Sequence, residues 1–226
     1  MRTAARAKSQ ISHKFFMSLR DLSFWAGSAR ADKLLIRLRR EHGNSEAFEK
    51  LYQQMSDPWS TTVPYFRYQL LKYQKILASL PDQQFHRTMD IGCGLGVMTR
   101  MLTAHADQVL GVDLSPTAVA SASRLSAGTP SVRFQQAELL HLKELAEPAF
   151  DLITMVDTIY YLPMLTDAVL KSVVDTLVEM LVPGGLILLA NHYYFRFDGY
   201  SRQTKHIHDF FGSQLTLLSA ATFSTW

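Results

Sequence analysis

From residue 87 onward, short apolar segments alternate with longer segments whose apolar residues recur every three or four positions. Phe150–Val156 is largely apolar, which is typical of a strand buried on both faces of a parallel sheet. Thr166–Leu181 instead places its leucines and valines along one side of a helix. This alternation predicts an α/β fold in which helices cover both faces of a doubly wound parallel sheet. The pattern predicts strands at Arg87–Ile91, Gln108–Val112, Val132–Gln136, Phe150–Val156, Leu186–Ala190 and Leu215–Leu218, and helices at Leu95–His105, between Pro116 and Ala127, at Thr166–Leu181 and at Gly199–Phe211.

The residues before the first predicted strand show only helical patterns. We therefore divide the chain into a basic helical arm (1–43), a helical cap (44–84) and a sheet domain (85–226). The cap either closes one end of the sheet or acts as a lid over a ligand, as lids in many transferases do. The helical segments expected before the sheet are Lys14–Trp25, Arg30–Arg40, Asn44–Met55 and Phe66–Leu80.

The composition of the 226 residues excludes several classes of protein. Its 47% hydrophobic and 19% charged residues are typical of a soluble globular chain. No run of 18 apolar residues occurs, so we expect no transmembrane segment. The single cysteine, Cys93, allows no internal disulfide and no Cys/His metal cluster, and it suits a reducing compartment such as the cytoplasm. Residues 1–20 contain five Lys/Arg and no acid, so an N-terminal targeting segment is an alternative.

The candidate chemistry centres on the loop after the first predicted strand, Asp90-Ile91-Gly92-Cys93-Gly94-Leu95-Gly96. Alternating glycines let the main chain approach a ligand closely, and the helix that follows directs unpaired N–H groups toward it. The Asp90 carboxylate would repel a pyrophosphate but attract a cationic amino-acid group. The spacing also disfavours a dinucleotide, because Val97 occupies the place of the third glycine in that fingerprint.

A second acid, Asp113, ends the second predicted strand 23 residues after Asp90. In a doubly wound sheet, an acid at that strand end binds ribose hydroxyls. Together the loop and this acid resemble motif I of the class I S-adenosylmethionine methyltransferases. The resemblance implies S-adenosylmethionine as cofactor, with Glu138 after the third strand near the adenine amino group. The cofactor-binding residues that we expect are Asp90, Gly92, Cys93, Gly94, Gly96, Asp113, Leu114, Ala137, Glu138 and Val156.

The end of the fourth predicted strand carries candidate catalytic residues. Asp157 stands outside the carboxyl end of this strand, where ligands of doubly wound sheets bind. A carboxylate or base there would help an acceptor to present a lone pair to the methyl group. A histidine beside a strand end can also be structural, so His192 has two interpretations. We predict Asp157, Tyr161 and His192 as catalytic, with Tyr160, Tyr193 and Tyr194 as further candidates.

Two further segments narrow the resemblance. Residues 150–162 resemble the fourth motif of small-molecule class I methyltransferases. Asp57-Pro58-Trp59, Tyr65 and Lys72-Tyr73 resemble the NodS-type nodulation methyltransferases, which N-methylate the terminal amino sugar of a chitooligosaccharide. The resemblance implies a small-molecule acceptor, such as an amino sugar or another amine, with N- and O-methylation both open. The class I fold normally closes with a hairpin of two strands, and because about eight residues follow Leu218 we expect a truncated hairpin.

The charge distribution leaves alternatives open. Residues 1–40 carry a net charge of +8, whereas residues 41–226 carry −5. Such an arm suits RNA or DNA as a partner, although the segment after Asp157 lacks the two prolines typical of amino-directed base methylation. A non-catalytic subunit that binds S-adenosylmethionine is another alternative, because a fold does not fix a function. The pattern predicts no oligomeric state.

Overall fold

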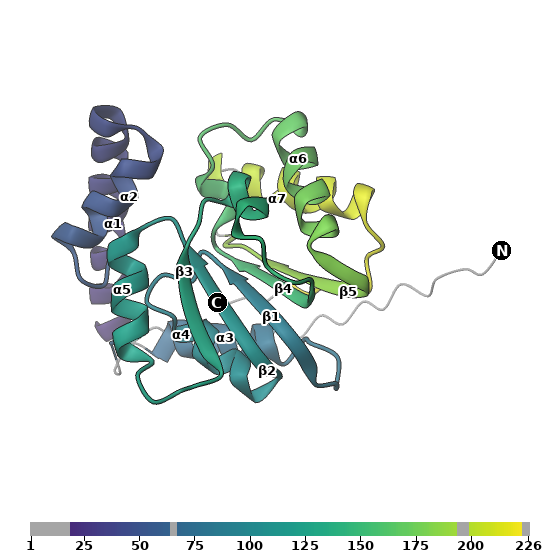
Figure 1. Cartoon of the computed structure of the whole chain (residues 1–226). Coiled ribbons are helices and arrows are strands. Elements are labelled where there is room, and N and C mark those ends of the chain that lie inside the picture. The colour runs from purple at the N-terminus through teal and green to yellow at the C-terminus, as the bar shows by residue number, and fades with distance from the viewer. Residues whose placement is uncertain (1–18, 64–66, 194–198, 223–226) are drawn as a thin grey trace.

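The computed structural model describes residues 19–63, 67–193 and 199–222, and a five-stranded parallel sheet forms its centre (Figure 1). The strand order is β3-β2-β1-β4-β5, so the order reverses between β1 and β4. The predicted α/β fold with a doubly wound sheet is confirmed. The strands are β1 (Phe85–Ile91), β2 (Ala106–Asp113), β3 (Val132–Gln136), β4 (Phe150–Val156) and β5 (Leu181–Ala190).

Strand β5 begins at Leu181, five residues before the predicted start at Leu186. It includes residues 182–185, which precede the predicted strand. Leu181 pairs with Phe150 of β4, and Leu186 pairs with Leu152. Residues 182–185 thus lie opposite a single residue of β4. They form an irregularity within the strand rather than a separate loop.

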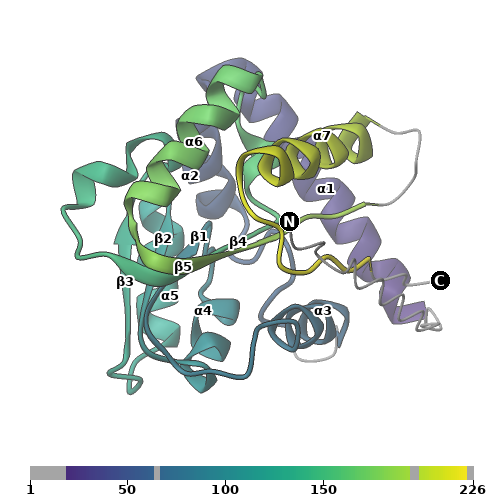
Figure 2. The same ribbon diagram turned by 90° about the vertical axis from the view of Figure 1, so that its right-hand side faces the viewer.

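Helices cover both faces of the sheet (Figure 2). On one face α6 (Asp167–Glu179) and α7 (Gly199–Gln214) pack against β1, β2 and β4 in one buried cluster. On the other face α3 (Arg67–Leu77) and α4 (Val97–Met101) form a second cluster with the sheet. Side chains of β4 alternate between the clusters, as those of a strand do. The other segments of this part are α5 (Pro116–Leu125) and the 3-10 turns η1 (Leu102–Ala104), η2 (Leu139–Leu145) and η3 (Ile159–Tyr161).

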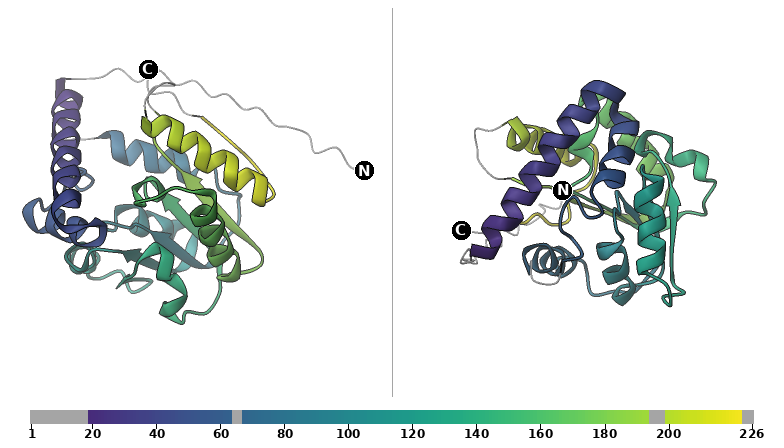
Figure 3. Two further views of the ribbon diagram at one scale, coloured as in Figure 1. Left: turned by 90° about the horizontal axis from the view of Figure 1, so that it is seen from above. Right: turned by 90° about the vertical axis from the view of Figure 1, so that its left-hand side faces the viewer.

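Two N-terminal helices lie outside the sheet, beside α5 (Figures 1 and 3). Helix α1 (Leu19–His42) is continuous where the sequence predicts two helices, and the part of the first before residue 19 lies outside the described residues. Helix α2 (Asn44–Gln54) follows Gly43, and the two helices share a buried cluster of leucines and an alanine. This cluster crosses the predicted boundary at residue 43, and the division into arm, cap and sheet domain stays a prediction.

A carboxylate of α2 anchors these helices to the sheet domain. Glu49 accepts hydrogen bonds from Ser115 Oγ at 2.6 Å, Thr117 Oγ1 at 2.5 Å and Thr117 N at 3.1 Å. Ser115 is the N-cap of α5, so Glu49 satisfies donors in a first helical turn, where negative charge is stabilised. Burial acts to raise the pKa of Glu49, but the hydrogen bonds from Ser115 and Thr117 outweigh it and lower the pKa.

The sixth predicted strand, Leu215–Leu218, is wrong. Helix α7 continues three residues beyond the predicted end at Phe211, and residues 215–222 form neither helix nor strand. Leu217 and Leu218 are 67% and 73% exposed, so these side chains do not pack against the sheet. Within the described residues β5 is the last strand. None of the helices in that part of the chain combines the length and the apolar character that crossing a bilayer demands.

Candidate active site

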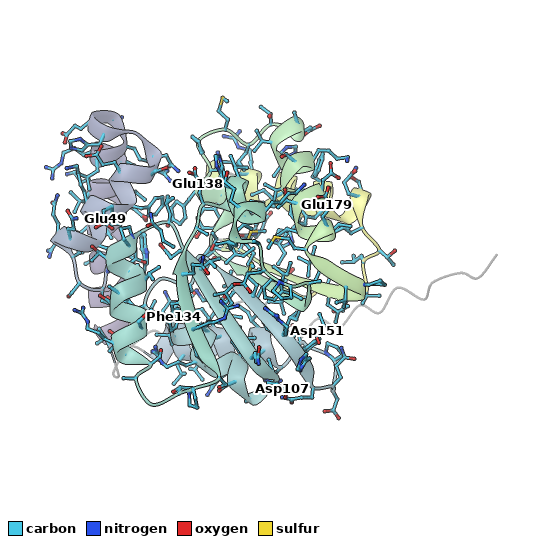
Figure 4. The ribbon with its side chains drawn as sticks, viewed as in Figure 1. Glu49, Asp107, Phe134, Glu138, Asp151 and Glu179 are labelled. Carbon is cyan, nitrogen blue, oxygen red and sulfur yellow. The ribbon has the colours of Figure 1, made fainter. Side chains whose placement is uncertain are left out.

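A cavity of about 230 Å³ lies between the carboxyl ends of the strands and the cap helices, as we call α1, α2 and α3. Figure 4 shows Glu138 beyond the carboxyl end of β3, whereas Asp107 and Asp151 lie at the opposite edge of the sheet. All three predicted catalytic residues, Asp157, Tyr161 and His192, line the cavity. The predicted cofactor-binding residues in its wall are Gly92, Cys93, Gly94, Asp113, Leu114, Ala137, Glu138 and Val156.

The first two glycines of the loop bring bare main chain to the cavity wall. Gly92 and Gly94 have φ angles of +73° and +52°, a left-handed conformation that favours glycine. A Cβ at Gly92 would lie 2.2 Å from Thr158 Oγ1, and a Cβ at Gly94 would lie 2.9 Å from Tyr52 Oη. The close approach of the loop to its neighbours therefore requires glycine at both positions.

The third glycine, Gly96, lies outside the cavity wall and serves packing. A Cβ at this position would lie 2.6 Å from the ring of Phe134, a residue of β3 that Figure 4 labels. Gly96 also precedes the first residue of α4, with a φ angle of +71°. The sequence predicts that Gly96 contacts the cofactor, but the structure places it away from the cavity. There the absence of a side chain makes room for the ring of Phe134 beneath the loop.

Asp90 also lies behind the loop. Its residue is 3% exposed, and its carboxylate accepts hydrogen bonds from Thr99 Oγ1 at 2.6 Å and Thr154 Oγ1 at 2.9 Å. Burial raises the pKa of Asp90 to about 6, although both hydroxyls act to lower it. The sequence predicts that the Asp90 carboxylate attracts a cationic group of the ligand. In the structure this carboxylate lies beneath the loop, where its two hydrogen bonds connect α4 to β4.

Asp113 ends β2 and lines the cavity. Its Oδ2 accepts a hydrogen bond from Gly94 N at 2.9 Å, and its Oδ1 accepts one from Ser115 N at 3.0 Å. Burial raises the pKa of Asp113, while these main-chain donors oppose the shift. The carboxylate therefore connects the glycine loop to the start of α5, at the strand end where ribose-binding acids lie.

Cys93 lines the cavity as a buried thiol. Burial raises the pKa of this thiol, and the nearby charges of Asp113 and Asp90 raise it further, so the sulfur stays protonated at neutral pH. Over the described ranges, no group of three or more His, Cys, Asp or Glu side chains is arranged to hold a metal ion.

Asp157 holds two side chains that come from distant parts of the chain. Lys72 Nζ of α3 lies 2.6 Å from its Oδ2, and His192 Nδ1, just after β5, lies 2.5 Å from its Oδ1. Asp157 itself has a φ angle of +53°, which is uncommon for a residue with a Cβ. Burial acts to raise the pKa of Asp157, but the charges and hydrogen bonds of His192 and Lys72 outweigh it and hold the pKa below its usual range.

His192 is held from several sides. Its ring stacks on Tyr68 of α3 with 6.5 Å between the ring centroids, and its main-chain oxygen accepts a hydrogen bond from Thr204 of α7 at 2.9 Å. Its main-chain N–H donates to Asp157 Oδ1 at 2.9 Å. Burial and the charge of Asp157 raise the pKa of Tyr68 to about 12, so its phenol stays protonated. When Nδ1 donates to Asp157, the lone pair of the neutral ring is on Nε2.

Tyr161 lies in an aromatic cluster that the cap helices and the turn after α2 contribute. Its ring stacks on Trp59 with 5.8 Å between centroids and meets Phe48 edge-on at 5.4 Å. The Arg39 guanidinium of α1 lies over the same ring and donates to the main-chain oxygen of Tyr161 at 2.7 Å. Tyr161 thus fastens the cap to the site, and its catalytic role stays a prediction.

Sequence reasoning missed most of the wall that the cap contributes. The sequence indicates Trp59 and Lys72 only through the resemblance to NodS-type methyltransferases. The turn that presents Trp59 has a readable signal, since Asp57 accepts hydrogen bonds from the main-chain N–H groups of Thr61 and Thr62. Of the further tyrosines considered, Tyr160 lines the cavity, Tyr193 is 45% exposed and absent from the wall, and Tyr194 lies outside the described residues. Wall residues that the sequence did not single out include Ser28, Asp32, Asn44, Phe48, Tyr52 and Gln69.

Comparison with known proteins finds similarity that centres on the sheet domain. Residues 89–187 match the family model of a methyltransferase domain. The chain is 26% identical to nodulation protein S of Sinorhizobium fredii over 156 residues, which are 65% of this chain and 70% of that protein. It is 32% identical to a ubiquinone biosynthesis O-methyltransferase of Nitrosococcus oceani over 122 residues, 53% of this chain and 48% of that protein. The chain therefore spans about half the length of the ubiquinone relatives it matches.

A solved structure gives the same assignment of the fold. The N-methyltransferase NodS from Bradyrhizobium japonicum, in complex with S-adenosyl-L-homocysteine, superposes with a TM-score of 0.56 at 22% identity. The match covers 65% of this chain and 72% of that one. At this identity the likeness shows a shared fold.

Proposed function

We propose that this chain, which carries a methyltransferase domain of the class I fold, transfers a methyl group from S-adenosylmethionine to a small-molecule acceptor. One observation carries the proposal. A single cavity is lined by the glycine loop and Asp113 at one end of the site, and by Asp157 and His192 at the other. A cofactor held at the first set and an acceptor held at the second would therefore share one enclosed space.

The residues present fit the cofactor. Gly92 and Gly94 leave main chain uncovered at the cavity wall, and Asp113 offers carboxylate oxygens at the tip of β2. We assign the ribose hydroxyls to Asp113 and the adenine amino group to Glu138, with Leu114, Ala137 and Val156 as apolar neighbours. Asp90 holds the loop from behind. When bound, S-adenosylmethionine supplies a methyl group on a positively charged sulfur.

The acceptor must present a free lone pair, and we assign this task to His192. Asp157 accepts a hydrogen bond from Nδ1 of His192 and so orients the ring. We assign to Nε2 the proton that the acceptor loses. Lys72 keeps Asp157 ionised, and the carboxylate in turn stabilises the imidazolium that forms. The cap helices exclude water from this proton transfer, which is the role that we propose for residues 44–84 together with α1.

The acceptor class follows from the same residues. The sequence similarity to nodulation protein S, together with the resemblance to NodS-type N-methyltransferases, favours a nitrogen acceptor. An amine that is protonated at neutral pH must lose a proton before its lone pair can attack. An amino sugar or another amine is therefore our first candidate. A hydroxyl acceptor is the alternative that the similarity to ubiquinone O-methyltransferases supports.

Two measurements test the proposal. Calorimetry with S-adenosylmethionine and the purified chain should show binding that Asp113→Ala weakens at least about tenfold, since a charged hydrogen bond at the ribose is lost. Mass spectrometry of pooled amines and alcohols incubated with enzyme and cofactor should show a product heavier by one CH₂ group. An unchanged affinity in the variant would overturn the cofactor assignment, and binding without any product would favour a non-catalytic subunit.

A basic face on α1 favours nucleic acid as a second candidate substrate. Arg30, Lys33, Arg37 and Arg40 are exposed and follow one another at helical spacing, so they share one side of the helix. Phosphate contacts by such a face would make RNA binding fall steeply as salt rises. Binding of a mixed-sequence RNA oligonucleotide at 50 and 200 mM salt, compared with an Arg30→Glu/Arg37→Glu variant, tests this. Equal and weak binding by both chains would remove the candidate.

A further inference from the structure

Among the hydrogen-bond acceptors of the cavity wall, three belong to the cap helices and receive no hydrogen bond from a described residue. They come from the three cap helices: Asp32 of α1, Asn44 of α2 and Gln69 of α3. The side-chain oxygens Asn44 Oδ1 and Gln69 Oε1 are buried and accept no hydrogen bond. The Asp32 carboxylate accepts no hydrogen bond and forms no ion pair with any described residue. Each group can accept a hydrogen bond from a ligand.

Gln69 is the most deeply buried of the three residues that carry these acceptors. Its residue is 6% exposed, and its amide nitrogen donates to the main-chain oxygen of Trp59 at 3.4 Å, whereas Oε1 accepts no hydrogen bond from a described residue. A buried amide oxygen without a donor costs free energy, so such groups in a native protein have a partner in the functional state. A ligand in the cavity that Gln69 lines would supply that partner.

The part of the wall that the cap helices contribute carries a negative charge at Asp32. Lys72 is neutralised by Asp157, and Asp113 is held by main-chain N–H groups. The remaining wall carboxylates, Asp32 and Glu138, form no ion pair with a described residue, and Asp32 is the one that a cap helix contributes. Burial raises the pKa of Asp32, while the charges of His192 and Arg39 lower it. The same wall includes the rings of Phe48, Trp59 and Tyr161, and aromatic faces attract organic cations.

We propose that Asp32, Asn44 and Gln69 bind the methyl acceptor and select a cationic molecule with several N–H or O–H donors over a neutral or carboxylate-bearing one. The inference rests on the proposed methyl transfer and names its specificity-determining residues. Asp32 pairs with a positive charge on the acceptor, and the two amide oxygens take its hydrogen-bond donors. The reacting group is a second N–H or O–H group of the same molecule, which lies toward His192 and gives its proton to that residue.

Two matched sets of compounds separate acceptor charge from acceptor shape. The first contains glucosamine, glucose and glucuronate, and the second contains tyramine, 4-methylphenol and 4-hydroxyphenylacetate. Each is incubated with the full chain and S-adenosylmethionine, and methylated product is quantified by mass spectrometry. We expect the amine of at least one set to give the most product. A preference for a neutral or acidic member overturns the inference but leaves methyl transfer standing, whereas bound cofactor with no product from any member counts against both.

Variants then assign the selection to the named residues. Asp32→Asn should raise KM for the amine about tenfold or more, with a smaller change in kcat, since a charged contact to the acceptor is lost. Gln69→Leu should raise the same KM. Glu41→Gln, an exposed carboxylate of the same helix α1, is the matched control and should behave as the parent chain. Calorimetry with S-adenosylhomocysteine should give one affinity for all of these chains, and an unchanged KM in Asp32→Asn despite that binding would overturn the assignment.

Discussion

Two carboxylates at neighbouring strand ends have opposite properties. Asp90 lies in β1 next to Thr154 of β4, and Asp157 follows the last residue of β4, so both lie near one point of the sheet. Asp90 receives two neutral hydroxyls, and burial raises its pKa to about 6. Asp157 receives Lys72 and His192, which hold its pKa below the usual range although burial opposes ionisation.

The difference shows that the partners of a carboxylate, rather than its burial, decide whether it carries charge. The end of the cavity that we propose for the cofactor lies at the glycine loop and Asp113. The carboxylates there and behind the loop accept hydrogen bonds from main-chain N–H groups and hydroxyls. The acceptor end joins residues 72, 157 and 192 through ion pairs between different elements. Four substitutions test this contrast between the two carboxylates and their surroundings.

Asp157→Asn should have the largest effect. The variant removes the charge that orients His192, so we expect kcat to fall by about 10²–10⁴-fold, the usual contribution of acid–base catalysis. Affinity for S-adenosylmethionine should stay within about twofold, because Asp157 belongs to the acceptor end. Single-turnover kinetics and calorimetry on the same preparation measure both quantities. A variant with parental turnover would remove Asp157 from the chemistry.

Lys72→Met makes the surroundings of Asp157 similar to those of Asp90. With one cation gone, the pKa of Asp157 should rise, and activity should fall about a hundredfold at neutral pH, as for loss of a partly buried pair. The active form has Asp157 ionised, so activity is lost as pH falls through its pKa. In the variant this loss should begin at higher pH than in the parent chain. Lys75→Met on the same helix serves as control, and a pH profile of kcat that coincides for Lys72→Met and the parent would contradict this role.

Asp90→Asn should stabilise the folded chain at neutral pH. The folded pKa of about 6 lies above the ordinary value of 3.8 for an aspartate, so the folded state binds the proton more tightly than the unfolded state does. The free energy of unfolding therefore declines as pH rises from about 4 to about 6. The amide removes this penalty, which is on the order of 2–3 kcal/mol above pH 6. Urea unfolding at pH 4.5 and pH 7.5 should show the two chains diverging at the higher pH. Parallel pH dependences would show that Asp90 is not protonated in the folded state.

Glu49→Gln should have the smallest effect. The substitution removes the negative charge from the first turn of α5, and we expect a loss of about 1 kcal/mol in the free energy of unfolding. Thermal unfolding measures this, with the exposed Glu46→Gln of the same helix as control. Affinity for S-adenosylhomocysteine should decline slightly as well, because Ser115, the N-cap of α5, stands two residues after Asp113. An equal shift for both variants would exclude a special role for Glu49.

The parts predicted from the sequence are those with local causes. The glycine loop, Asp113 and the ends of the parallel strands could be placed together because such strands all end at one edge. The predicted resemblance to methyltransferases is confirmed by the family match over residues 89–187. The predicted roles of individual site residues stay predictions.

The rest could not be predicted because its causes are distant in sequence. Lys72 meets Asp157 across 85 residues, and no local pattern records that contact. Asp32 lies in a helix whose packing against the site depends on Arg39 and Tyr161, 122 residues apart. The wrong strand at Leu215–Leu218 has a related cause, since an apolar run becomes a strand only where a neighbour offers hydrogen bonds.

The contact of Glu49 with Ser115 and Thr117 limits how this chain can be recombined with its relatives. A chimaera that exchanges the N-terminal helices to obtain a new acceptor preference would leave three donors at the start of α5 without their carboxylate. It would also loosen the segment that carries Asp113. A chimaera that folds and binds its ligands should therefore exchange Glu49 together with residues 115–117. The exchanged unit then consists of two segments that are separate in the sequence.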